Sequence, residues 1–479
     1  MILSIIFLLI ATSVTWVFTL PKFKNKYIFN IISAAVLCVL TFLYWNNCIL
    51  NTDFYKKINF YENMNPIDTY YSNTFHTTFL FYINSTVIEK PSNYSKETVS
   101  ALINDDSEVE SGNPDIIFIM MESYFDPNTL FDLNFTEPIN ENYKAISQKA
   151  VYGNMLSFKY GGGTRDIEFN VLNEINTTQY TESISYMNVF GNDYLPSFVH
   201  NLKDAGYKTY ALHAYTSQLY NRINAYANMG FDCSKFVDEY SHTDKYGNYV
   251  SDISHAEEII DTYEKLKSEG DEPVFIYGVS MQNHIYMSQN NIEFDRVYLT
   301  DDDYSDEFTQ GIGVVGSYMR QTDNAIGKLY EYFENSSREV VIIIYGDHQS
   351  YNVENLDGFS VESLNEIQKY KDSSENEKYI YSHSTPFIMW SNKRDSEDAY
   401  YPLVSPHYLW SIACNRFNLE SSGYEKFLFN SATVMPVDNN YAKIYYNNDY
   451  MPDCRDETTG NNVNLLNYDR LFGQGFSLE

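Results

Sequence analysis

The segment Asp115–Met121 (DIIFIMM) is a short apolar run that ends in a carboxylate at Glu122, and Val340–Tyr345 (VVIIIY) is a second run, followed by Gly-Asp-His at residues 346–348. Both runs have the length and composition of buried β-strands. Between them lies GGGTRDIEF, residues 161–169, a glycine-rich turn that opens a helical pattern. These segments predict a buried sheet with polar side chains placed directly after its strands.

From Pro114 onward, short apolar runs alternate with amphipathic stretches. The predicted strands are Asp115–Met121, Lys208–Leu212, Pro273–Val279, Val340–Tyr345 and Pro386–Trp390. The predicted helices include Leu195–Ala205, His255–Lys267 and Gly316–Phe333. This alternation predicts an α/β domain in which helices cover both faces of a mainly parallel sheet. Functional groups collect beyond the carboxyl ends of the strands in such sheets.

The first fifty residues contain two apolar runs, Met1–Leu20 and Tyr27–Leu50, each long enough to cross a hydrocarbon core. The lysine-rich connection at residues 21–26 favours the cytoplasmic side, although Lys56 and Lys57 beyond the second run weaken this charge argument. A cleaved signal peptide is the alternative interpretation of the first run, which lacks a basic start and a small-residue cleavage site. We therefore expect a two-span protein of the cell membrane.

The rest of the chain is then expected outside the cell, in two parts. Residues 51–113 read as a juxtamembrane connector, with Ser95 as a candidate helix N-cap and a polar, acidic end at residues 105–113. Residues 114–479 form the main domain with a C-terminal extension.

The charge and the cysteines exclude some classes of protein. The formal net charge is −32, which argues against a nucleic-acid partner because the phosphate backbone would be repelled. A chain with this charge would bind an anionic lipid only where a local cation offsets the repulsion. Five cysteines without metal-type spacing argue against a disulfide framework.

Glu122, Thr164, Asp347 and His348 are candidate ligands of one divalent cation. Two carboxylates, a hydroxyl and an imidazole suit manganese or magnesium better than structural zinc. A cation could activate the threonine hydroxyl, which is a poor nucleophile alone, for phosphoryl transfer. Each residue also has a structural interpretation: Thr164 as a helix N-cap, Glu122 as an acid at a helix entry, and Asp347-His348 as a surface turn.

Other polar residues follow the predicted strands. His284 ends the segment SMQNH at residues 280–284 and is a candidate proton donor or acceptor at a leaving oxygen. Arg222 is a candidate for a bidentate contact with phosphate. The alternatives are a structural histidine and a surface ion pair. His213 follows the strand near residue 210, and the backbone of Gly163 could approach an anion at the helix start.

In these motifs the chain resembles the lipoteichoic acid synthase family, the membrane-anchored phosphoglycerol transferases in the sulfatase branch of the alkaline phosphatase superfamily. The matching segments are KPSNYSKETV (90–99), MMES (120–123), GGGTRDIEF (161–169), YNR (220–222), SMQNH (280–284), YGDH (345–348), TPFIMWSN (385–392) and YDRLFG (468–473). They cover most of the chain after the predicted anchor, and their common order makes the match much more specific than any single motif.

The resemblance implies a sulfatase-like fold, an enzyme and a set of site residues. It implies one divalent cation, usually manganese or magnesium, at Glu122, Thr164, Asp347 and His348, with Thr164 as the nucleophile. It implies substrate contacts at His213, Arg222 and His284, and we expect Tyr220, Arg165 and Gly163 to line the same site. Glycerophosphate would pass from a phosphatidylglycerol-like lipid to a cell-envelope glycan or glycolipid through a threonine ester.

The sequence also departs from this family. Arg165 follows the nucleophile where a small or polar residue is usual, and Tyr220 stands where these synthases tend to carry tryptophan. The two predicted spans contrast with five in polymerising members. The formylglycine signature C-x-P-x-R of true sulfatases is absent around Thr164, which argues against ester sulfate hydrolysis. The remaining alternatives are a phosphoethanolamine transferase, a phosphodiesterase, or a non-catalytic surface binding protein.

Overall fold

The structure is a computed structural model, and it describes residues 35–43, 71–75, 77–79, 88–104, 112–180, 194–301, 303–350, 352–354, 361–394, 399–440, 442–447, 449, 452 and 454–478. The chain divides into two compact units, Met1–Glu89 and Lys90–Glu479. In the first unit, residues 35–43 are helical. The remainder of both predicted spans lies outside the described residues. Among the described residues, no helix combines the length and apolarity needed to cross a membrane.

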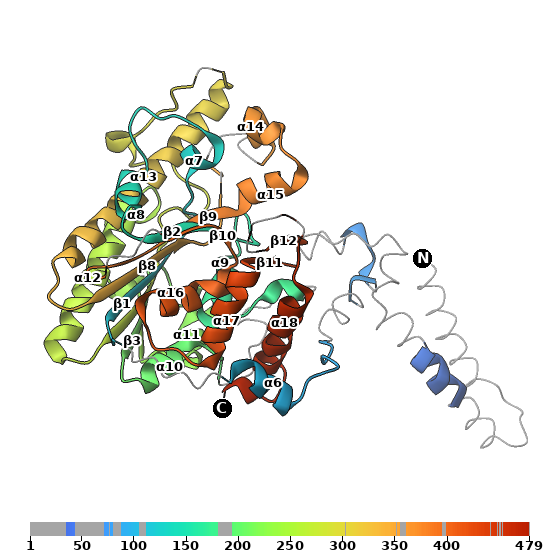
Figure 1. The fold of residues 1–479 in the computed structure, drawn as a ribbon. Coiled ribbons are helices and arrows are strands. Elements are labelled where there is room, and N and C mark those ends of the chain that lie inside the picture. Colours follow the sequence, from blue (N-terminus) through green and yellow to red (C-terminus); the bar gives the residue numbers. More distant parts are fainter. Residues whose placement is uncertain are drawn as a thin grey trace, which may run out of the picture. The chain divides into compact units, whose positions relative to one another are not determined.

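The second unit is built on an eight-stranded sheet with the strand order β10-β2-β9-β8-β1-β7-β3-β4 (Figure 1). Its strands are β1 (Asp115–Met121), β2 (Val151–Leu156), β3 (Lys208–His213), β4 (Cys233–Phe236), β7 (Val274–Val279), β8 (Val340–Gly346), β9 (Ser384–Ser391) and β10 (Ala399–Val404). All neighbours from β8 to β4 pair in parallel, whereas β9 runs antiparallel to both β8 and β2. The predicted mainly parallel α/β sheet is confirmed.

Helices cover both faces of this sheet (Figure 1). Because successive side chains of a strand point to opposite faces, β1 shows which helices lie where. Ile117 and Ile119 belong to the core that contains residues of α8 (Glu141–Ser147), α12 (Asp252–Glu269) and α13 (Asp306–Glu334). On the other face, the ring of Phe118 packs against Phe198 of α10 (Phe198–Asp204) and Trp410 of α16 (Leu409–Phe417).

The remaining helices are α6 (Lys96–Ile103), α7 (Pro127–Phe131), α9 (Thr164–Asn173), α11 (Arg222–Asn228), α14 (Gln368–Lys371), α15 (Glu375–His383), α17 (Gly423–Val434) and α18 (Glu457–Leu471). Ser95 caps α6 as predicted, since its side chain accepts a hydrogen bond from the Thr98 amide. The Tyr94 ring packs against Tyr468 and Phe476, so residues 90–104 of the predicted connector pack with the main domain.

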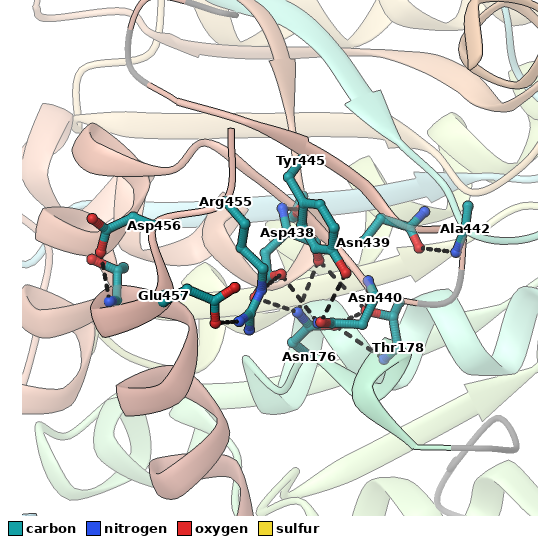
Figure 2. A network of polar contacts seen from close by, with 12 residues as sticks. Asn176, Thr178, Asp438, Asn439, Asn440, Ala442, Tyr445, Arg455, Asp456 and Glu457 are labelled. Carbon is teal, nitrogen blue, oxygen red and sulfur yellow. Dashed lines mark hydrogen bonds and ion pairs between the residues drawn. The ribbon is translucent and has the colours of Figure 1, made fainter. Parts of the chain in front are cut away.

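A polar network joins the C-terminal part to the segment that follows α9 (Figure 2). Its centre is the buried Asp438, in the two-stranded sheet of β11 (Val437–Asn439) and β12 (Ile444–Tyr446). Asn176, shortly after α9, donates to the Asp438 carbonyl oxygen at 2.9 Å and to its Oδ2 at 3.2 Å. Arg455 Nε lies 3.5 Å from Asp438 Oδ1 and neutralises this carboxylate. The network therefore anchors the end of the helix that carries Thr164.

Candidate active site

Glu122 and Asp347 lie side by side because β1 and β8 are adjacent parallel strands. The register pairs Met121 with Gly346, so the next residue of each strand is a buried carboxylate at the same edge of the sheet. Gly346 is required for this approach, since a Cβ there would lie 2.0 Å from the backbone oxygen of Tyr124. Asp347 Oδ1 accepts hydrogen bonds of 2.7 Å from the amides of both Ser123 and His348, which fixes the carboxylate.

His348 presents one ring nitrogen to these carboxylates. Its Nδ1 lies 3.1 Å from the carbonyl oxygen of Gln349, which can only accept, so Nδ1 carries the proton and Nε2 has a free lone pair. That Nε2 lies 3.3 Å from Asp347 Oδ2 and 3.6 Å from Glu122 Oε1. A carbonyl that holds the distal nitrogen in this way is the arrangement found behind metal-binding histidines.

Thr164 completes the group as the first residue of α9. The N-cap of this helix is Gly163, which has φ +93°. The structure therefore does not use Thr164 as the N-cap. Its Oγ1 lies 3.2 Å from Glu122 Oε2 and 3.4 Å from His348 Nε2. The side chain of Lys159 occupies the space where a Cβ of residue 163 would lie, so only glycine fits there.

A divalent cation fits these residues. One ligand atom from each of Glu122, Asp347 and His348 lies within 4.8 Å of the others, and all three residues are buried. Asp347 Oδ2 is buried and accepts no hydrogen bond from a described residue. Burial, followed by the charge of Glu122, raises the pKa of Asp347 to about 7. Two buried carboxylates that face no cation are unfavourable. A positive charge between Glu122 and Asp347 would therefore stabilise the site.

Arg222 lies in a second polar cluster next to α9. Its Nε donates to Glu168 Oε2 at 3.0 Å, and both side chains are almost completely buried. Glu168 also accepts a 2.6 Å hydrogen bond from the Tyr226 hydroxyl. The sequence allowed a surface ion pair for Arg222. The structure instead shows a buried ion pair with Glu168, which joins α9 to α11. Glu168 was not predicted, although it lies one helical turn after Thr164.

His213 is held between Arg222 and the sheet. Arg222 Nη1 lies 3.0 Å from His213 Nε2, which must accept, while His213 Nδ1 faces the Val279 carbonyl oxygen at 3.4 Å. Burial, followed by the charge of Arg222, holds the pKa of His213 well below its usual range. His213 is therefore a neutral imidazole that orients the guanidinium, and its predicted substrate contact stays a prediction.

His284 lies beyond β7, the strand between β1 and β3. Its Nδ1 lies 2.9 Å from the Ile285 carbonyl oxygen and so carries a proton. The Tyr249 ring contacts the imidazole edge-on, with centroids 5.4 Å apart. Nε2 makes no hydrogen bond with a described residue. With Nδ1 donating to this carbonyl, Nε2 is the nitrogen that can take up a proton and then release it, as a general base and then a general acid must do.

The buried pair of Glu168 and Arg222 yields a stability prediction. We expect Glu168→Gln to lower the free energy of unfolding by about 3–5 kcal/mol, because a buried guanidinium loses the carboxylate that faces it. Chemical denaturation measures the loss. Glu334→Gln is the matched control, since it removes an exposed partner of Lys149 and should leave the free energy of unfolding almost unchanged. Equal losses in the two variants would contradict the assigned role of the pair.

Comparison with known proteins identifies the family. Residues 114–413 match the sulfatase family model. A putative cyclic β-1,2-glucan modification protein of Rhizobium meliloti (strain 1021) is 25% identical over 375 residues, which are 77% of this chain and 56% of that protein. The capsular polysaccharide biosynthesis protein RkpI of the same organism is 26% identical over 203 residues, which are 42% of this chain and 35% of that protein. This chain spans about half the length, or less, of the curated relatives it matches.

The solved structures that share the fold include two named for phosphoglycerol or lipoteichoic acid chemistry. The phosphoglycerol transferase GacH of Streptococcus pyogenes, in complex with sn-glycerol-1-phosphate, has a TM-score of 0.64 at 22% identity, and the match covers 82% of this chain and 97% of that one. The lipoteichoic acid synthase LtaP of Listeria monocytogenes has a TM-score of 0.54 at 14% identity, with 80% and 98% covered. The expected sulfatase-like fold is confirmed, and the chain belongs to the sulfatase family.

Proposed function

We propose that this chain is a membrane-anchored, extracellular and metal-dependent phosphotransferase. It would move glycerophosphate from a phosphatidylglycerol-like lipid to a cell-envelope glycan or glycolipid through an ester on Thr164. The observation that carries the proposal is the contact of the Thr164 hydroxyl with Glu122 and His348, inside a cluster that could hold one divalent cation. The apolar runs at residues 1–20 and 27–50 support the anchor and the extracellular location.

Glu122, Asp347 and His348, with Thr164, would hold the cation, which we expect to be manganese or magnesium. Bound there, it would stabilise the threonine alkoxide and neutralise charge on the phosphoryl oxygens. The donor set of two carboxylates, one hydroxyl and one imidazole nitrogen matches the preference of either ion for oxygen-rich sites.

The residues of this chain account for both halves of the transfer. Thr164 Oγ1 would form a bond to phosphorus and release its proton towards Glu122 Oε2, 3.2 Å away. The bond between phosphorus and the diacylglycerol oxygen would break, and protonated His284 Nε2 would protonate that oxygen. An acceptor hydroxyl would then give its proton to His284 Nε2 and bond to phosphorus, while Thr164 leaves and regains its proton. Two opposite half-reactions thus return every group to its starting state.

Incubating the full chain with labelled phosphatidylglycerol and manganese tests this function. We expect release of diacylglycerol, and mass spectrometry should find a glycerophosphoryl group on the peptide that contains Thr164. A phosphoethanolamine group on Thr164, in an assay supplied with both lipids, would favour the phosphoethanolamine transferase. Free glycerophosphate without transfer to any acceptor would favour a phosphodiesterase. No release from either lipid would refute the proposal and favour a non-catalytic protein.

A further inference from the structure

The ring of Tyr220 lies near two guanidinium groups at the candidate site. Arg165 Cζ lies 5.4 Å from the ring centroid and Arg222 Cζ lies 5.1 Å from it, both within cation–π distance. Tyr220 and Asn221 both have positive φ, at +58° and +54°, so a tight turn places the ring there. Arg165 follows the proposed nucleophile directly. The aromatic ring of Tyr220 is therefore already engaged by two cations of the protein.

The acidic side chains of the same region are also paired with cations. Lys159 Nζ lies 2.8 Å from Asp166 Oδ2, and Arg165 Nε lies 3.6 Å from Asp166 Oδ1. Glu168 is paired with Arg222. Three cationic and two anionic side chains leave one net positive charge around the start of α9, in a chain whose formal net charge is −32. The remaining nearby acids, Glu122 and Asp347, belong to the candidate metal site.

We propose that Arg165, together with Tyr220, makes this site select a phosphate ester with a neutral, hydroxyl-bearing headgroup over one with an ammonium group. The inference rests on the proposed function and names the substrate class within it. Proteins bind an ammonium group through the π-face of an aromatic ring or through an unpaired carboxylate. Here Arg165 and Arg222 lie over the Tyr220 ring and also pair with Asp166 and Glu168. A polyol, in contrast, can accept hydrogen bonds from a guanidinium. The Tyr220 hydroxyl, which makes no hydrogen bond with a described residue, offers a further donor and acceptor.

Arg165 is suited to this selective role because it is partly open to solvent. Its side chain is 32% exposed, whereas Arg222 is 1% exposed and is held by Glu168 and His213. Arg165 can thus approach a ligand without losing its ion pair, and its replacement should not disturb the buried core. The neighbouring Lys159 is 24% exposed and adds a second positive charge at the same side of Asp166.

Calorimetric titration of the manganese-loaded full chain with glycerophosphate and with phosphoethanolamine tests the inference. Both ligands are phosphate monoesters, but the headgroup of glycerophosphate carries two neutral hydroxyls and that of phosphoethanolamine carries one ammonium group. We expect glycerophosphate to bind about tenfold more tightly, the ratio that 1.4 kcal/mol supplies. Arg165→Gln should bring the ratio close to one, whereas Arg165→Lys, which keeps the charge, should retain most of it. Added salt should lower the ratio in the wild type by screening.

Lys203→Gln is the matched control. It removes one positive charge from α10, where Lys203 pairs with Asp232 and is 47% exposed, and it should leave the ratio unchanged. Equal or tighter binding of phosphoethanolamine by the wild type, or an unchanged ratio in Arg165→Gln, would overturn the selectivity. A preserved binding preference without diacylglycerol release from phosphatidylglycerol would instead refute the proposed transfer and leave the selectivity standing.

Discussion

Replacing Thr164 by alanine is expected to lower diacylglycerol release from phosphatidylglycerol by about a thousandfold or more. The variant lacks the hydroxyl that lies 3.2 Å from Glu122 Oε2 and 3.4 Å from His348 Nε2, the ring nitrogen that faces the two carboxylates. Without it, the ester intermediate cannot form, and water must attack the phosphorus directly. The assay measures labelled diacylglycerol under single-turnover conditions, and mass spectrometry should find no phosphorylated peptide.

The fold should survive this replacement. Thr164 does not cap its helix, because Gly163 is the N-cap and no side chain bonds to the free amides there. We therefore expect almost the same unfolding transition as in the wild type. Thr164→Ser keeps the hydroxyl and should retain part of the activity.

Thr433→Ala is the matched control for Thr164→Ala. This exposed residue lies in the last turn of α17, where its hydroxyl bonds to the carbonyl oxygen of Asn430. It should not change turnover. Undiminished turnover in Thr164→Ala would remove the threonine from the mechanism and leave the fold assignment untouched.

The buried parallel strands were predictable because strands covered on both faces form continuous apolar runs. The predicted run Val340–Tyr345 differs from β8 only by Gly346 at its end. Strands with mixed composition were not predicted. β4 reads CSKF at the edge of the sheet, and β2 contains Gly153, where a Cβ would lie 1.8 Å from the Tyr401 carbonyl oxygen. Their patterns depend on neighbours that local sequence does not specify.

The convergence of Glu122 and Asp347 was also predictable, since the carboxyl ends of parallel strands share one edge. The partners of Arg222 were not. Glu168 is 54 positions away, and helical spacing shows only that it lies on the same face as Thr164. The tautomers of His348 and His284 depend on carbonyl groups of the local turns, so only the folded backbone determines which nitrogen is available.

Removing the divalent cation is expected to abolish transfer and to lower the stability of the domain together. A ligand present at one hundred times its Kd stabilises the folded state by about 2.7 kcal/mol, so chelation should lower the melting temperature and manganese should restore it. Activity and melting temperature should recover over the same range of free metal, because one site governs both.

The variant Asp347→Asn tests whether the stabilising cation binds at this site or at another surface of the protein. The amide oxygen can still accept from the amides of Ser123 and His348, so the local backbone should keep its hydrogen bonds. The variant removes the charge that faces Glu122 in a buried site. We therefore expect the metal-free variant to be at least as stable as the metal-free wild type, yet to gain little from manganese and to lose transfer by about a thousandfold or more.

Asp261→Asn is the matched control for the loss of one carboxylate. Asp261 lies on α12, is 60% exposed and pairs with His242. This variant should therefore respond to manganese like the wild type. The decisive comparison is the manganese-induced rise in melting temperature. If that rise were equal in Asp347→Asn and in the wild type, the stabilising cation would bind elsewhere, and the hydroxyl of Thr164 would need another source of activation. If it disappears only in Asp347→Asn, the cation lies where Glu122, Asp347 and His348 meet, in contact with the proposed nucleophile.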